Sequence, residues 1–200
     1  MWSINLSGKS SHFRMNRQLF VFTTGASGAG KTSILKAIES KVSSEPASVN
    51  YFDDIGVPSQ YEMVMTHGSE ANWQDAALSF WIEKLSKTNG KELVFLEGSF
   101  DPDLLMKYTA QFHLKNFIVV CVDSTRAIRE ARLRRYRPAT QTHLICQNME
   151  NFAKLIKAST IKNQGSVFKN NYTKMPVDRI AAKLLSEIKR SVGHGTLHSI

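Results

Sequence analysis

The chain has 200 residues, of which 42% are hydrophobic and 22% are charged, so it is long enough to bury one core as a single domain. No apolar run approaches the length needed to cross a bilayer, which excludes a membrane-spanning protein. Two cysteines, Cys121 and Cys146, are too few for a disulfide scaffold or a cysteine metal cluster, and they predict reduced core thiols in a cytoplasmic protein.

The net charge of +9 indicates acidic partners. Much of the excess lies in residues 126–137, which hold six arginines. A site for a nucleotide and a second phosphorylated or acidic substrate collects such residues, and we favour this explanation. Attraction to nucleic acid is the alternative that the same charge supports.

The chain begins with residues 1–17, which carry basic residues and serines but no acid, and we treat them as a flexible N-terminal extension. Residues 18–24 are an apolar run that predicts a short buried strand. Apolar residues at helical spacing then predict a helix over residues 31–42, which a Ser- and Pro-containing stretch ends.

The segment between this strand and helix, residues 25–32, matches the phosphate-binding pattern G-x-x-x-x-G-K-[ST], known as Walker A. Its backbone N–H groups can surround a phosphate, and the positive end of the following helix lies at the same point. We expect Lys31 to contact the β- and γ-phosphates and Thr32 to ligate Mg²⁺. The predicted nucleotide-binding residues are Gly25, Ala26, Ser27, Gly28, Ala29, Gly30, Lys31, Thr32 and Ser33.

A second strand is expected at residues 48–52 and ends at two acids, Asp53 and Asp54. One of these carboxylates is suitably placed to hold or deprotonate an acceptor hydroxyl, and Asp53 is our first choice. Residues 55–69 are expected to be loop with a short helical piece, followed by a helix over residues 72–87.

The helix over residues 72–87 contains two tryptophans, Trp73 and Trp81. We expect Trp81 to pack in the core. Trp73, near the start of the helix, is the better candidate for contact with a substrate.

The third and fourth strands are expected at residues 93–98 and 117–122, with a short helix after Pro102 between them. Glu97 follows four apolar residues at the end of the third strand, a position typical of a Walker-B acid that acts on Mg²⁺. Strands that alternate with helices predict a parallel sheet covered on both faces, whose ligands bind beyond the carboxyl ends of the strands. The phosphate loop, Asp53 and Glu97 all fall at such ends and therefore predict one active site.

Arginine-rich residues 126–137 predict a helix that follows the fourth strand. Arg132 and Arg135 are three residues apart on one helix face, where both could clamp phosphoryl oxygens. A helix over 142–158, a weak fifth strand over 166–172 and a final helix over 177–188 complete the pattern. We expect a domain over 18–191 with a short lid around 132–142, and a C-terminal tail over 192–200.

These motifs together resemble the P-loop small-molecule kinases, the group that contains adenylate, shikimate and gluconate kinases. Within it the chain is most similar to poorly characterised bacterial P-loop kinases. The resemblance implies an α/β fold with a five-stranded parallel sheet of order 2-3-1-4-5, helices on both faces, and ATP with Mg²⁺ as the phosphoryl donor. It implies that Asp53 is the acceptor-side carboxylate and that Arg132 and Arg135 are lid arginines.

The sequence departs from the best-known members of the group. Only a few residues separate Arg135 from the next helix, so no long or zinc-bearing lid fits. The acceptor signatures of shikimate and gluconate kinases are not recognisable, which leaves the acceptor open.

We therefore predict an ATP-dependent phosphotransferase that acts on a small-molecule hydroxyl or phosphate. An NTP hydrolase, a nucleotide-binding regulatory protein and a kinase of polynucleotide ends are the alternatives. Guanine specificity is unsupported, because Pro176 stands where a guanine-reading element needs an aspartate.

Overall fold

The computed structural model describes residues 18–42, 47–90, 93–136 and 139–193, and it describes only the backbone of residues 139–148. The expected N-terminal extension, residues 1–17, lies outside the described residues, as do residues 194–200 of the expected tail. The same holds for residues 137–138 of the expected lid and for the side chain of Cys146.

Five parallel strands form one sheet in the order β2-β3-β1-β4-β5, which confirms the predicted α/β class and strand order. Strand β5 ends earlier than the sequence suggested, because its ladder with β4 stops where β4 ends, at Asp123 opposite Lys169. The strands are β1 (Leu19–Thr24), β2 (Ala47–Tyr51), β3 (Leu93–Glu97), β4 (Phe117–Asp123) and β5 (Ser166–Lys169).

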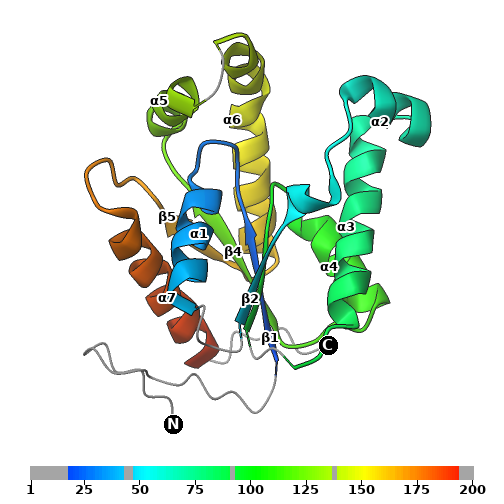
Figure 1. Cartoon of the computed structure of the whole chain (residues 1–200), viewed down its shortest axis with the longest axis vertical. Coiled ribbons are helices and arrows are strands. Elements are labelled where there is room, and N and C mark those ends of the chain that lie inside the picture. The colour runs from blue at the N-terminus through cyan, green and yellow to red at the C-terminus, as the bar shows by residue number, and fades with distance from the viewer. Residues whose placement is uncertain (1–17, 43–46, 91–92, 137–138, 194–200) are drawn as a thin grey trace.

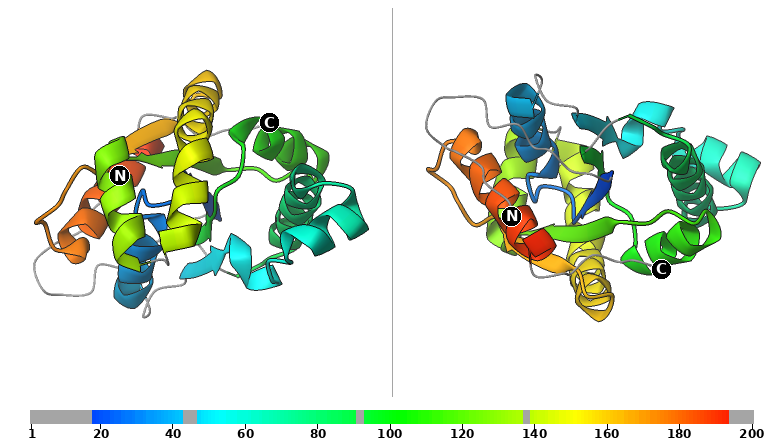
Figure 2. Two further views of the ribbon diagram at one scale, coloured as in Figure 1. Left: turned by 90° about the horizontal axis from the view of Figure 1, so that it is seen from above. Right: turned by 90° about the horizontal axis from the view of Figure 1, so that it is seen from below.

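Helices cover both faces of this sheet (Figures 1 and 2). One face packs against α1 (Lys31–Val42) and α7 (Val177–Gly193). The other face packs against α3 (Glu70–Ser86), α4 (Pro102–Gln111) and α6 (Ala139–Lys162). Both faces of the central strands are therefore buried, which explains their continuously apolar sequence.

Alternate residues of β1 divide between the two cores. Phe20 and Phe22 pack toward α3 and α4, whereas Leu19 and Val21 pack toward α1 and α7. These four side chains are at most 5% exposed. The period of two along a strand sends successive side chains to opposite faces, so β1 anchors both layers.

Trp73 and Trp81 both lie in the core beneath the turn that follows β2. The Trp81 indole N–H donates to the Phe52 carbonyl oxygen at 3.0 Å, as expected for a core tryptophan with a polar partner. Trp73 is 8% exposed and meets the Phe52 ring edge-on at 6.1 Å. Most of the Trp73 ring is therefore taken up by packing against Phe52, and its contact with a substrate stays a prediction.

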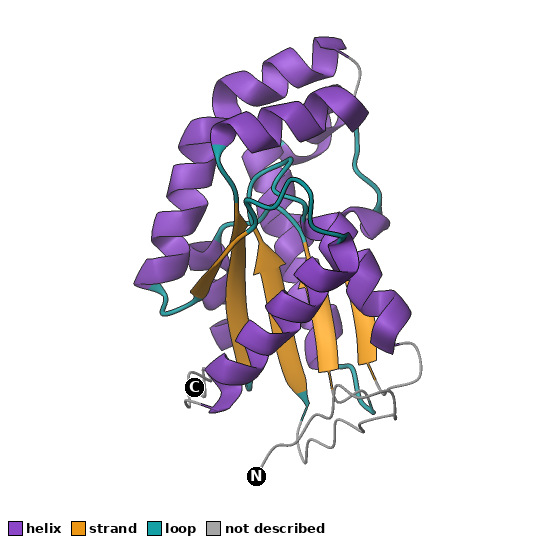
Figure 3. Ribbon diagram, turned by 90° about the vertical axis from the view of Figure 1, so that its left-hand side faces the viewer, coloured by secondary structure: helices purple, strands orange, loops and turns teal. Residues whose placement is uncertain are grey.

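The loops at the carboxyl ends of the strands gather at one edge of the sheet (Figure 3). The short elements there are the 3-10 turn η1 (Phe52–Ile55), α2 (Gln60–His67) at the outer end of α3, and α5 (Arg126–Tyr136). Among the described residues, no helix combines the length and the apolarity that a membrane span requires.

Candidate active site

The phosphate loop joins the end of β1 to the start of α1. Its backbone turns back on itself, since the Ala29 N–H donates to the Ala26 carbonyl oxygen at 3.2 Å. Helix α1 begins directly after the loop, where the Ile34 N–H donates to the Gly30 carbonyl oxygen at 3.1 Å. The amino end of α1 and the loop N–H groups therefore lie together, the arrangement that binds phosphate.

Gly28 allows the backbone of α5 to pack closely against the phosphate loop. Its φ is +78°, and a Cβ built there would lie 2.7 Å from the Arg129 carbonyl oxygen. No L side chain fits this position without moving the backbone of α5. The loop is thus clamped between α1 and α5.

Lys31 is the only cation of the predicted loop, and its side chain is 7% exposed. Its ammonium group donates to the carbonyl oxygens of Gly25 at 2.8 Å and Ala26 at 3.3 Å. It also donates to the Ser99 hydroxyl at 3.0 Å and lies 3.8 Å from Glu97 Oε1. The ammonium is thus held over the loop by oxygen atoms, which phosphate oxygens could replace.

Thr32 and Glu97, the two residues expected to act on Mg²⁺, lie in contact. The Thr32 hydroxyl donates to Glu97 Oε2 at 3.1 Å. Burial raises the pKa of the Glu97 carboxyl above its usual value of 4.5, against the opposing effects of the Lys31 charge and the Thr32 hydrogen bond. A hydroxyl and a carboxylate are hard oxygen ligands, so this pair fits Mg²⁺, which takes one or two protein ligands beside phosphate oxygens and water.

Asp53 and Asp54 lie on the 3-10 turn η1, and both are exposed. They follow β2, whose last residue, Tyr51, lies opposite Glu97 in the sheet, so both carboxylates lie at the same edge as the phosphate loop. Their charges also contribute to the raised pKa of Glu97. Exposed carboxylates on a turn beside the loop can reach a hydroxyl of a second substrate.

Arg132 on α5 bonds directly to the phosphate loop. Its guanidinium donates to the carbonyl oxygens of Gly28 at 3.3 Å and Ala29 at 2.9 Å. It donates on its other side to the carbonyl oxygens of Asn170 at 3.2 Å and Tyr172 at 3.1 Å. Partial burial lowers the pKa of this guanidinium. Arg132 therefore connects the loop to the segment after β5.

Arg135 lies apart from these contacts. It is exposed on α5, and its guanidinium carbon lies 5.5 Å from the centre of the Tyr136 ring. The structure thus brings Arg132 to the loop and leaves Arg135 at the surface.

Two further residues belong to the site but were missed in the sequence. The Ser99 hydroxyl accepts from Lys31 and donates to the Gly25 carbonyl oxygen at 3.0 Å. The buried Asn170 amide donates to the Ala29 carbonyl oxygen at 2.7 Å. The only signal for Ser99 was its place two residues after Glu97. Asn170 gave none, because its partner is 141 residues away in the chain.

No protein-family model and no curated protein sequence matches the chain. Solved structures do match in fold. A shikimate kinase from Acinetobacter baumannii in complex with shikimate superposes with a TM-score of 0.63 at 16% identity, over 87% of this chain and 94% of that one. A gluconokinase from Sinorhizobium meliloti matches with a TM-score of 0.60 at 14% identity, over 91% of this chain and 99% of that one.

A third match is a deoxyadenosine kinase from M. mycoides with the products dCMP and dCDP bound. It has a TM-score of 0.56 at 12% identity and covers 86% of this chain and 100% of its own. The chain thus has the fold of the P-loop small-molecule kinases, which confirms the predicted resemblance at the level of fold.

Proposed function

We propose that this protein is an ATP-dependent kinase that transfers the γ-phosphoryl group to a small-molecule hydroxyl or phosphate. The observation that carries the proposal is the convergence of Lys31, Thr32 and Glu97 at the mouth of a complete phosphate loop. The fold of small-molecule kinases supports the same reading, since each of the three compared structures is named for a small acceptor.

The donor side of the site is built to hold a triphosphate. The loop N–H groups bind the phosphates, and Lys31 exchanges its carbonyl partners for β- and γ-phosphate oxygens. Thr32 and Glu97 would hold Mg²⁺, which when bound neutralises charge between the β- and γ-phosphates. Arg132 keeps the loop in place through the carbonyl oxygens of Gly28 and Ala29.

The acceptor side is supplied by η1. The acceptor oxygen attacks the γ-phosphorus as the bond to the oxygen that bridges the β- and γ-phosphates breaks, and ADP leaves. Asp53 orients the acceptor hydroxyl and takes its proton. Arg135, which lies within the expected lid and is exposed on α5, would close over the transferred group. An acceptor that is itself a phosphate would be held by the same basic helix.

The test is the release of ADP from Mg·ATP over a panel of nucleosides, nucleotides, sugars, hydroxy acids and oligonucleotides. Acceptor-dependent release is expected. Release without acceptor would indicate a hydrolase, and release that depends on oligonucleotides would indicate a kinase of polynucleotide ends. Nucleotide binding with no ADP release under any of these conditions would indicate a nucleotide-binding regulatory protein.

Matched variants make this test specific to the site. Lys31→Ala should abolish turnover and weaken nucleotide binding, whereas Lys36→Ala, on the exposed face of the same helix, should do neither. Asp53→Asn should lower kcat far more than it raises the Kd for ATP. An equal loss in both would assign Asp53 to structure or to the metal, and a larger effect of Asp54→Asn would assign the acceptor role to Asp54.

A further inference from the structure

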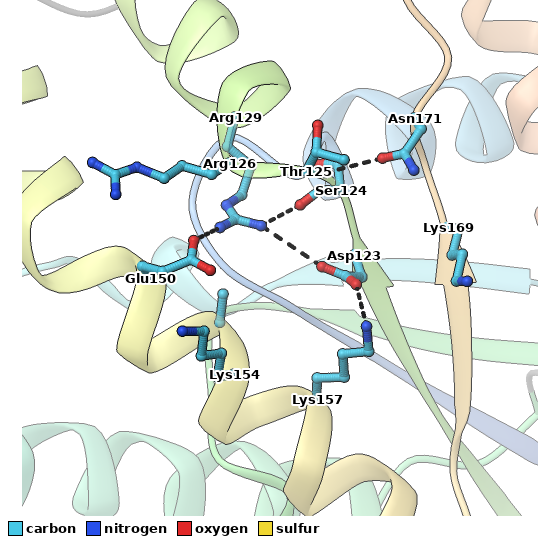
Figure 4. Close-up of a pocket in the computed structure, with 11 residues that line it drawn as sticks. Asp123, Ser124, Thr125, Arg126, Arg129, Glu150, Lys154, Lys157, Lys169 and Asn171 are labelled. Carbon is cyan, nitrogen blue, oxygen red and sulfur yellow. Dashed lines mark hydrogen bonds and ion pairs between the residues drawn. The ribbon is translucent and has the colours of Figure 1, made fainter.

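A pocket that contains no residue of the phosphate loop lies at the carboxyl end of β4, beside the first turn of α5 (Figure 4). It has a volume of about 400 Å³, enough for a small metabolite. Arg129 separates the two sites, because its backbone packs against Gly28 while its side chain lines the pocket. The lining comes from the ends of β4 and β5, the first turn of α5 and the facing side of α6.

Positive charge exceeds negative charge in this pocket. Five cations and two carboxylates line it: Arg126, Arg129, Lys154, Lys157 and Lys169, with Asp123 and Glu150. Both carboxylates are already engaged by cations of the pocket itself. Like charges gathered at one place repel one another, so such a cluster favours an anionic ligand.

The ion pairs account for only some of these cations. Arg129 bonds to Glu150 at 2.5 Å and lies 3.7 Å from Asp123, and Lys157 bonds to Asp123 at 2.9 Å. Lys154 and Lys169 are exposed and form no ion pair with any of the residues that the structure describes. Two ammonium groups at the rim of the pocket are therefore available to a ligand.

Two of the lining residues, Ser124 and Arg129, carry buried polar groups that no described residue satisfies. Ser124 is 4% exposed, and its hydroxyl has no hydrogen-bond partner among the described residues. Arg129 is 3% exposed, and its Nε–H is likewise unpartnered within the described part of the chain. Buried polar groups are nearly always paired, so an unpaired hydroxyl and N–H beside a basic pocket point to a bound acceptor.

The helix that begins at the pocket adds to the same field. α5 starts at Arg126, and its first turn contains no acidic residue. The positive end of its dipole thus acts in the pocket together with the lysines. A phosphate group suits this set better than a carboxylate, because it offers three or more acceptor oxygens to a hydroxyl, an N–H and two ammonium groups.

We propose that this pocket is a second anion site, which binds the phosphate group of a small phosphorylated metabolite and is separate from the phosphate loop. It needs no phosphoryl transfer and does not depend on the kinase activity proposed above. The pocket is lined by the first turn of α5, the same helix whose Arg132 bonds to the carbonyl oxygens of the phosphate loop.

The test is a calorimetric titration with inorganic phosphate at constant ionic strength, in the presence of saturating Mg·AMP-PNP to occupy the phosphate loop. The wild-type protein should bind phosphate under these conditions. The double variant Lys154→Ala/Lys169→Ala should bind it about tenfold more weakly or worse, since hydrogen bonds to charged groups are worth about a factor of ten each.

A matched control distinguishes binding in the pocket from a general effect of the protein's net charge. Lys36→Ala/Lys115→Ala removes the same charge from exposed positions away from the pocket and should leave the affinity unchanged. Equal weakening in both double variants would overturn the proposal, as would an absence of binding by the wild-type protein. Binding of a single-stranded oligonucleotide through the pocket lysines, without binding of inorganic phosphate, would also contradict it.

Ser124→Ala gives a second, independent readout. Because the hydroxyl has no hydrogen-bond partner among the residues that the structure describes, its removal should leave the unfolding midpoint unchanged or slightly higher while phosphate affinity falls. A lower midpoint with unchanged phosphate affinity would assign Ser124 to the fold alone and refute its role in the pocket.

Discussion

Arg132→Ala tests how the phosphate loop is held. The guanidinium makes four hydrogen bonds of 2.9–3.3 Å, two to the loop and two to the segment after β5. Hydrogen bonds from charged groups contribute about 1.5–3 kcal/mol each, but they are not additive around one group. The side chain is also only partly buried, so water can replace some of them in the variant. We expect a loss of about 2–4 kcal/mol in the free energy of unfolding.

The assay is urea unfolding of the nucleotide-free protein. A fall in the midpoint with an unchanged m-value would report lost stability, and the corresponding fall in Tm should be about 4–16 °C. Arg132→Lys keeps the charge but lacks the fork that spans both segments, so about half of the loss should remain. Arg134→Ala is the control. Its side chain is 73% exposed and 3.8 Å from Glu130, so its removal should cost less than about 0.5 kcal/mol.

One result would refute this reasoning. If Arg132→Ala unfolded within about 0.5 kcal/mol of the wild-type protein but lost turnover, the guanidinium would act on substrate and not on the loop. Arg132 would then have the clamping role that the sequence suggested for it.

Three further predictions concern other residues of the site. Gly28→Ala should destabilise the protein by about 1–3 kcal/mol more than Gly56→Ala in urea unfolding. Both glycines have positive φ, but only Gly28 has a backbone oxygen 2.7 Å from the new Cβ. Equal losses of stability in the two variants would show that the backbone of α5 moves to accommodate the methyl group. The wild-type protein should lose stability as pH rises from 4.5 through the raised pKa of Glu97, because the folded state must then ionise a buried carboxyl. Glu97→Gln has no such group, so its stability relative to the wild-type protein should increase over the same pH range. A difference that shrinks with pH would contradict the raised pKa. Burial, followed by the nearby Asp123 charge, raises the pKa of the Cys121 thiol to about 11, so in a Cys146→Ser background iodoacetamide should modify Cys121 at pH 8 only after unfolding. Rapid modification of the folded variant would show that the thiol is accessible.

Local sequence patterns predicted the elements that carry the site. The loop over 25–32 was recognisable because its chemistry depends on residue types at fixed spacing, and α1 begins at Lys31 as that pattern requires. Continuously apolar runs predicted β1, β3 and β4, since buried parallel strands need apolar side chains on both faces. The order of the strands came from the resemblance, because periodicity does not say which strands pair.

Helix ends were predicted less well than helix cores. α6 runs from Ala139 to Lys162, beyond the expected residues 142–158 at both ends. At its carboxyl end, Ser159 and Thr160 are buried, and the Ser159 hydroxyl donates to Asp101 at 3.0 Å, so tertiary contacts support a turn that the local pattern did not predict. Thr32 and Glu97, by contrast, were expected in one site and lie in contact, because the phosphate loop follows β1 and Glu97 ends β3, and the carboxyl ends of parallel strands lie at the same edge.

The sequence by itself determined the chemistry of the loop and the alternation of strands and helices, since both are written in residues close together along the chain. Only the tertiary structure decided what the long side chains do. Lys31 contacts Ser99 across 68 residues, and Arg132 contacts Ala29 across 103 residues. Arg129, one of five arginines in α5, is buried between the phosphate loop and the pocket at the end of β4, while Arg135 is at the surface. These arginines have identical side chains, but their roles differ because only one face of α5 packs against the loop and α6.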